Sequence, residues 1–115
     1  MAKEKASETK KIEELQLTEQ NLQNLLLQKQ VFQLELVETQ TALEELKKSE
    51  GDAFKIVGSL MIKAEKGALE KELSKKKELL ELRIKSIEKQ EKELREELNK
   101  KRSEILKNMK GIQNT

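Results

Sequence analysis

The 115-residue sequence contains no cysteine, histidine, proline, tryptophan or tyrosine, and phenylalanine is its only aromatic residue type. Without cysteine or histidine, the usual ligands of zinc, haem and iron–sulfur sites are missing. Histidine is also the most common general base in enzymes, and cysteine is the most nucleophilic side chain, so both of these catalytic groups are missing. Glycine-rich phosphate-binding patterns and the calcium-loop pattern do not occur either. We therefore expect a protein that is not an enzyme and that uses no metal and no cofactor.

Long apolar runs are also absent. The longest one is far shorter than the roughly 20 residues that a membrane-spanning helix requires. The first residues, MAKEKASETKK, contain no apolar segment of the kind that marks a secretory signal peptide. Together with the lack of cysteine, which suits a reducing compartment, these features predict a cytoplasmic protein with no membrane partner.

Charged residues, mostly glutamate and lysine, make up 40% of the chain, and leucine and glutamine are frequent among the others. This composition is typical of long helices and coiled coils. We expect the few glycines to mark helix ends or turns and to interrupt no helix. They are Gly51, Gly58, Gly67 and Gly111. The pattern predicts one domain over residues 1–115, with a helix at about 8–48, a β-hairpin at about 53–64 and a helix at about 67–110.

Each predicted helix carries an apolar seam with the alternating three- and four-residue steps of a coiled coil. The first seam comprises Leu15, Thr18, Leu22, Leu25, Lys29, Phe32, Leu36, Thr39, Leu43 and Leu46. The second comprises Leu73, Leu80, Ile84, Ile87, Leu94, Leu98 and Ile105. The two helices are therefore expected to pack on each other along these seams.

One antiparallel register aligns the two seams in four all-apolar layers. The layers pair Leu22 with Leu94, Phe32 with Ile84, Leu36 with Leu80 and Leu43 with Leu73. Toward the termini, polar residues enter the pairing, because Leu15 then faces Lys101 and Leu25 faces Glu91. Two interpretations remain open: the polar residues fix the register, or the helix ends separate and present apolar side chains.

The segment AFKIVGSLMIKA, residues 53–64, interrupts the helical pattern with β-branched and apolar residues around Gly58-Ser59. Glycine at the first central position suits a two-residue type II′ turn, which predicts a β-hairpin. Such a hairpin is apolar on both faces and open at both edges, and alone it would be marginal in water. The segment either packs on its own helices as a loop or joins hairpins of other subunits in a shared sheet. We favour the shared sheet.

Two other functions fit parts of the pattern. A structural coiled-coil scaffold or tether, without clients, would keep its assembly after deletion of residues 53–64. A nucleic-acid binder is suggested by the run Lys75-Lys76-Lys77 and would lose affinity steeply with salt. Because there is no aromatic platform and glutamates are interleaved throughout the chain, we interpret the run as a solvated helix face and expect no nucleic-acid partner.

Taken together, three segments resemble the β-type subunits of the prefoldin family. They are LQLTEQNLQNLLLQKQVFQLELVETQTALEELKK, FKIVGSLMIKA and KKKELLELRIKSIEKQEKELREEL, which span Leu15 to Leu98. The resemblance lies in the glutamine-rich first helix combined with one central VGS hairpin. The lysine- and glutamate-rich termini resemble archaeal members, whereas MAKEKASETKK carries no family signal.

The resemblance implies a mainly α fold, an antiparallel two-helix coiled coil whose hairpin pools into an intersubunit β-barrel. It implies an ATP-independent chaperone that holds non-native proteins at its coiled-coil tips and delivers them to a group II chaperonin. The partner would be an α-type subunit, in a hexamer of two α-type and four β-type chains. Oligomerisation would fall on Phe54, Ile56, Val57, Leu60, Met61 and Ile62. Client binding would fall on Ile12, Leu15, Ile105, Leu106, Met109 and Ile112.

Overall fold

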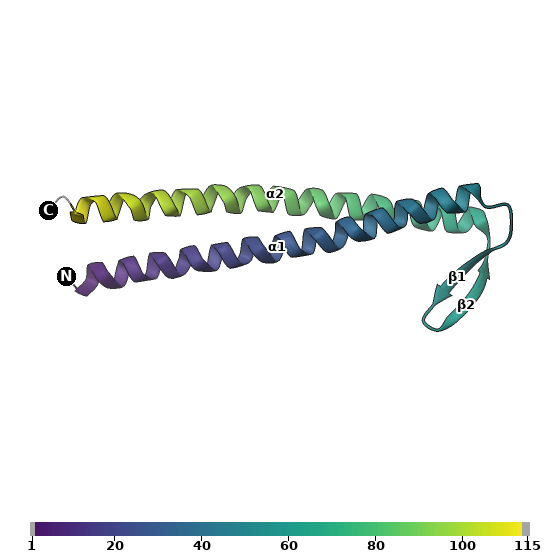
Figure 1. Ribbon diagram of the computed structural model, residues 1–115, viewed down its shortest axis with the longest axis horizontal. Helices are drawn as coiled ribbons and strands as arrows, with labels where there is room; N and C mark the ends of the chain where they lie inside the picture. Colours follow the sequence, from purple (N-terminus) through teal and green to yellow (C-terminus); the bar gives the residue numbers. More distant parts are fainter. Residues whose placement is uncertain (1, 114–115) are drawn as a thin grey trace. The chain divides into compact units, whose positions relative to one another are not determined.

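The computed structural model describes the backbone of residues 2–113 and the side chains of residues 6–109. Two long helices pack together and are joined by an antiparallel β-hairpin, as the sequence predicts (Figure 1). The elements are α1 (Ala2–Lys48), β1 (Ala53–Val57), β2 (Leu60–Ala64) and α2 (Lys66–Gln113). The chain divides into two compact units. The terminal unit comprises Met1–Lys29 and Ser86–Thr115, and the hairpin unit comprises Gln30–Lys85.

The helices extend beyond the predicted ends. Helix α1 begins at Ala2 instead of near residue 8, and α2 includes both Gly67 and Gly111. The expectation that no glycine lies within a helix was therefore wrong. A glycine weakens a helix by only about 1 kcal/mol, which the strong helix formers around it can offset. Among the glycines of the described residues, only Gly58 has a positive φ.

The terminal unit is a pair of helical segments, and in it the start of α1 and the end of α2 lie at the same end (Figure 1). Its buried residues include Leu22 from α1 and both Ile87 and Leu98 from α2. Thr18 is buried too, and its hydroxyl donates a 2.9 Å hydrogen bond to the carbonyl of Glu14. A polar seam residue is thus accommodated because its donor is satisfied by its own helix.

The hairpin unit pairs the remaining helical segments and carries the β-hairpin, which projects away from them (Figure 1). Leu43, Leu80 and Ile84 are buried between its helices. The guanidinium of Arg83 lies 5.6 Å from the centroid of the Phe32 ring, a distance suited to a cation–π interaction. This contact places Phe32 beside the turn of α2 that contains Ile84, as the predicted register requires.

The predicted seams are confirmed in full. All ten positions on α1 and all seven on α2 are buried or half-buried. The side chains that face outward between them are mostly charged or carboxamide groups. The heptad pattern therefore identified the packed face of each helix without any tertiary information.

Contacts in the terminal unit refine the register. Lys101, expected opposite Leu15, instead donates a 3.0 Å hydrogen bond from its Nζ to the hydroxyl of Thr18. In the same way, Lys29 donates to Glu91, which was expected opposite Leu25. Helical side chains lean toward the N-terminus of their own helix, so each long lysine reaches about one turn in that direction. Both contacts are therefore compatible with the predicted backbone register.

The hairpin has the predicted register, with Val57 paired to Leu60 and Ala53 paired to Ala64. Gly58 and Ser59 form the two-residue turn. Gly58 has φ of 61°, and no other residue of the described chain, Ser59 included, has a positive φ. A positive φ at the first central position alone distinguishes a type II′ turn from a type I′ turn. The turn type predicted from the Gly-Ser pair is confirmed.

Candidate functional site

The β-hairpin exposes six large apolar side chains, the same six that the sequence assigned to oligomerisation. They are Phe54, Ile56, Val57, Leu60, Met61 and Ile62, with exposed fractions between 48% and 71%. The strand register places Ile56 beside Met61 on one face and Val57 beside Leu60 on the other. Because the sheet has only two strands, each strand also has an unpaired outer edge. The hairpin thus offers both apolar faces and free backbone groups to a partner.

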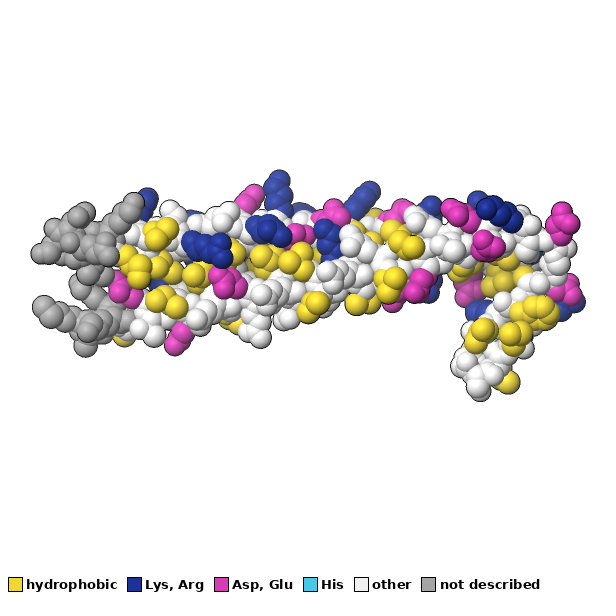
Figure 2. Space-filling view, viewed as in Figure 1, with side chains coloured by type: hydrophobic (Ala, Val, Ile, Leu, Met, Phe, Trp, Pro, Cys, Tyr) yellow, Lys and Arg dark blue, Asp and Glu magenta, His cyan; other side chains and the backbone are white. Residues whose placement is uncertain are grey.

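Only the base of the hairpin is attached to the helices. Ala53 is buried, and the Lys55 ammonium lies 2.6 Å from the Glu72 carboxylate of α2. Lys63 of β2 pairs at 3.5 Å with Asp52, which lies in the connection between α1 and β1. The apolar side chains beyond this base remain open, as Figure 2 shows for the projecting hairpin. The alternative of a loop packed on its own helices is therefore wrong.

The ends of the two helices in the terminal unit hold the residues expected to bind clients. Ile12, Leu106 and Met109 are exposed by 40%, 58% and 50%, respectively. Leu15 and Ile105 are half-buried. In Figure 2, hydrophobic side chains gather toward this end of the unit. The side chain of Ile112 lies outside the described residues.

A charged network crosses the helix pair in the terminal unit. Lys29 lies on the α1 seam, and its ammonium is 3.3 Å from Glu91 and 3.8 Å from Glu88. Arg95, one turn after Glu91 on α2, donates two hydrogen bonds to the same carboxylate. The bond from Arg95 is the main cause that lowers the pKa of Glu91; Lys29 adds to this effect, and desolvation opposes it. The charges of this network are therefore matched with one another.

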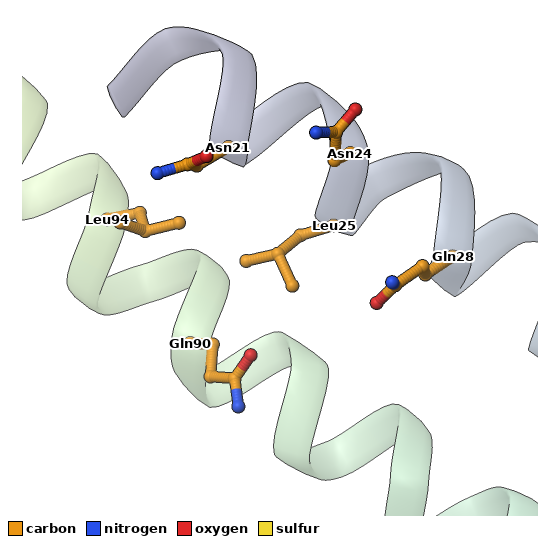
Figure 3. Close-up of a pocket in the computed structure, with 6 residues that line it drawn as sticks. All are labelled: Asn21, Asn24, Leu25, Gln28, Gln90 and Leu94. Carbon is orange, nitrogen blue, oxygen red and sulfur yellow. The ribbon is translucent and has the colours of Figure 1, made fainter. Parts of the chain in front are cut away.

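An open groove lies between the helices of the terminal unit (Figure 3). It has a volume of about 300 Å³ and is lined by Asn21, Asn24, Leu25, Gln28, Gln90 and Leu94. Leu25 and Leu94 point toward each other, and the side chains of Asn21 and Gln28 extend from α1 toward α2 (Figure 3). Sequence patterns did not indicate this groove, although Leu25 facing polar residues was a sign of incomplete packing.

Apolar residues on outward helix faces were also missed. In the hairpin unit, Val31, Leu34 and Val37 of α1 are each exposed by 57% or more. Leu79 and Leu82 of α2 are exposed by 49% and 65%. Val31, Leu34 and Val37 follow one another at three-residue intervals and lie off the heptad seam. This spacing could have indicated apolar residues on the outer face of α1.

Two kinds of site are absent from the described residues. Their acidic side chains form no group of three that could hold a metal ion. Neither helix contains, within its described part, a stretch long and apolar enough to cross a membrane. The features that stand out are surfaces suited to protein partners: the hairpin, the helix ends and the groove.

A two-helix coiled coil that exposes an apolar β-hairpin defines a class of protein subunits built for assembly. The sequence model of the family described as "Prefoldin subunit" matches residues 9–112. The chain therefore belongs to the prefoldin subunit family, which is known as a family of chaperone subunits. Proteins of its beta type form hetero-oligomers with other prefoldin subunits.

Individual relatives agree with this assignment. The chain is 43% identical over 90 residues to a prefoldin subunit beta of Pyrobaculum arsenaticum, which covers 76% of this chain and 73% of the relative. It is 45% identical over 86 residues to one of Saccharolobus islandicus, covering 73% of this chain and 68% of the relative. All of these relatives are archaeal.

Solved structures show the same architecture. The crystal structure of the prefoldin beta subunit from Thermococcus strain KS-1 matches with a TM-score of 0.81 and 35% identity, covering 89% of this chain and 91% of that one. The beta2 subunit of the same organism matches with a TM-score of 0.68 at 22% identity, covering 76% of this chain and 95% of that one. The second likeness concerns the fold alone.

Proposed function

We propose that this chain is a β-type subunit of an ATP-independent chaperone that binds non-native proteins and delivers them to a group II chaperonin. The observation that carries the proposal is the hairpin, whose six apolar side chains are exposed although the rest of the fold is packed along its seams. Membership of the prefoldin family supports it. The proposed location is the cytoplasm, and residues 1–115 would act as a single prefoldin-like domain.

Assembly would be driven by the hairpin. An isolated two-stranded hairpin is marginal in water, and its exposed edges favour pairing with further strands. Pairing with hairpins of other subunits would satisfy the outer backbone groups and cover both apolar faces. We propose that the hairpins pool into an intersubunit β-barrel, in a hexamer with two α-type and four β-type chains.

Client binding would use the apolar residues at the helix ends of the terminal unit. Unfolded proteins expose apolar side chains of varied shape, and flexible leucine and methionine side chains can adapt to them. Ile12, Leu106 and Met109 are exposed enough to make such contacts without unpacking the seam. Several weak contacts on different subunits would combine through their high effective concentration. No bond is made or broken, so the function requires no catalytic group.

The test is reconstitution with an archaeal α-type prefoldin subunit. The mass of the complex is measured by light scattering after gel filtration, and the complex is then added to a denatured protein that aggregates on dilution. We expect a mass near that of a hexamer and a strong reduction in aggregation without added ATP. A complex that forms normally and leaves aggregation unchanged would favour the alternative of a structural scaffold.

A further inference from the structure

The groove in the terminal unit differs in chemical character from the chain as a whole. Four of its six lining residues carry carboxamides, the other two are leucines, and none carries a charge. This contrasts with the chain as a whole, in which 40% of the residues are charged. The charges of Lys29, Glu91 and Arg95, which belong to the same helix pair, are paired with one another.

The carboxamides of the groove have free hydrogen-bonding capacity. None of those of Asn21, Asn24, Gln28 and Gln90 makes a hydrogen bond to another part of the described chain. Each carboxamide offers two N–H donors and one carbonyl acceptor. A peptide group offers one donor and one acceptor, and so it is the complement of a carboxamide.

The floor of the groove is apolar. Leu25 and Leu94 point toward each other but are only half-buried, because the seam around them includes polar residues (Figure 3). The volume of this open groove, about 300 Å³, lies at the lower end of the range for ligand sites. It suits a single apolar side chain together with the peptide groups on either side of it.

We propose that this groove binds an extended, uncharged polypeptide segment by its backbone, with one apolar side chain seated on Leu25 and Leu94. The inference rests on the proposed chaperone function and specifies a contact of that function away from the helix ends. Recognition through the main chain depends little on sequence, which is what a protein that binds many unfolded chains requires. A folded protein would not fit, because its peptide groups are already paired.

The test uses a soluble, fluorescently labelled peptide of alternating leucine and serine, and the same peptide with its leucine nitrogens methylated. Methylation removes backbone N–H donors and keeps the side chains. Binding to the full-length chain, in complex with an α-type subunit, is measured by fluorescence anisotropy. The groove variant is Asn21→Ala/Gln28→Ala/Gln90→Ala. The matched control, Gln16→Ala/Gln20→Ala/Gln23→Ala, removes three exposed carboxamides that do not line the groove.

We expect methylation to weaken binding to the wild-type complex about tenfold, since each hydrogen bond contributes about two- to tenfold. The groove variant should bind the unmethylated peptide at least about tenfold more weakly and should respond little to methylation. The control should behave as wild type. Alanine favours helices, so circular dichroism should show unchanged helix content in both variants.

Wild-type affinity in the groove variant, or equal affinity of the wild type for both peptides, would overturn the inference. Suppression of client aggregation is measured on the same samples and reports on the proposed function separately. If the wild-type complex suppresses aggregation and the groove variant binds the peptide as tightly as wild type, the groove is not the binding site. The proposed chaperone function is then still supported. A wild-type complex that neither binds the peptide nor suppresses aggregation would refute both.

Discussion

The ammonium of Lys29 on α1 lies 3.3 Å from the Glu91 carboxylate on α2, across the seam of the terminal unit. Both side chains are largely shielded from water, with exposed fractions of 22% and 15%. A lysine at a seam position costs packing energy, and its pairing with Glu91 ties α1 to one position along α2. The pair therefore favours the interpretation in which polar seam residues fix the register.

The first prediction is a measurable coupling between these two residues. In a double-mutant cycle with Lys29→Met and Glu91→Gln, we expect an interaction of about 0.5–1 kcal/mol in the free energy of unfolding. The cycle of Lys29→Met with Glu88→Gln is the control. Because Glu88 is half-exposed and lies 3.8 Å away, its coupling should be smaller. Urea unfolding at one protein concentration gives these values, and equal coupling in both cycles would contradict the prediction.

The second prediction concerns acid. The pKa of Glu91 is lowered below its ordinary value of 4.5, chiefly by the Arg95 hydrogen bond. The carboxylate therefore takes up a proton more readily in the unfolded chain, and its stabilising contribution is present above pH 4.5. This contribution is lost as the pH falls through the lower pKa of the folded state. Glu91→Gln should flatten the loss of stability as the pH falls below 4.5, measured by urea unfolding at a series of pH values; a loss as steep as that of the wild type would contradict the prediction.

The third prediction tests the hairpin. Ile56→Lys combined with Leu60→Lys should prevent assembly, because it would place one charge on each face of a shared sheet. Helix content should hardly change, since neither side chain packs on the helices: they are exposed by 71% and 65%. Leu17→Lys with Leu82→Lys, at exposed helix positions, is the matched control. The mass of the complex is measured by light scattering. An unchanged mass in the Ile56→Lys/Leu60→Lys variant would show that the hairpin is not the assembly site.

The fourth prediction tests the helix ends. Replacement of Ile12, Leu15, Ile105 and Met109 by serine or glutamine should abolish protection of a denatured client and leave assembly intact. Single changes should have small effects, because the contacts are spread over several subunits. The outcome is read from the turbidity of diluted client and from the mass of the complex. Normal assembly with undiminished protection would place the client site elsewhere on the complex.

The fifth prediction concerns the turn. Gly58→Ala should destabilise the hairpin by about 1–2 kcal/mol, because its φ of 61° is costly for a residue with a Cβ. Nothing lies within 4 Å of an added Cβ, so the effect would come from the backbone alone. Gly51→Ala is the control, since that site is equally open and has no positive φ. The concentration needed for assembly should rise about tenfold or more in Gly58→Ala only.

Much of the fold could be predicted because its determinants are local. Heptad spacing placed residues such as Leu22 and Leu80 on the packed face, where the structure buries both. The Gly58-Ser59 pair determined the turn type and, through it, the face on which each strand residue lies. Helix ends were less predictable, because the propensity of a single glycine such as Gly67 is outweighed by its neighbours.

The sequence by itself determined the two helices, their apolar seams, the hairpin and the resemblance to prefoldin, since each depends on periodicity or on a short motif. Only the tertiary structure decided how far a lysine reaches across the pair, which hairpin residues stay exposed, and that carboxamides from α1 and α2 meet around Leu25 and Leu94. These features depend on side chains far apart in the sequence. Their meeting is set by the lean of each side chain and the packing of its neighbours, which no pattern along one helix contains.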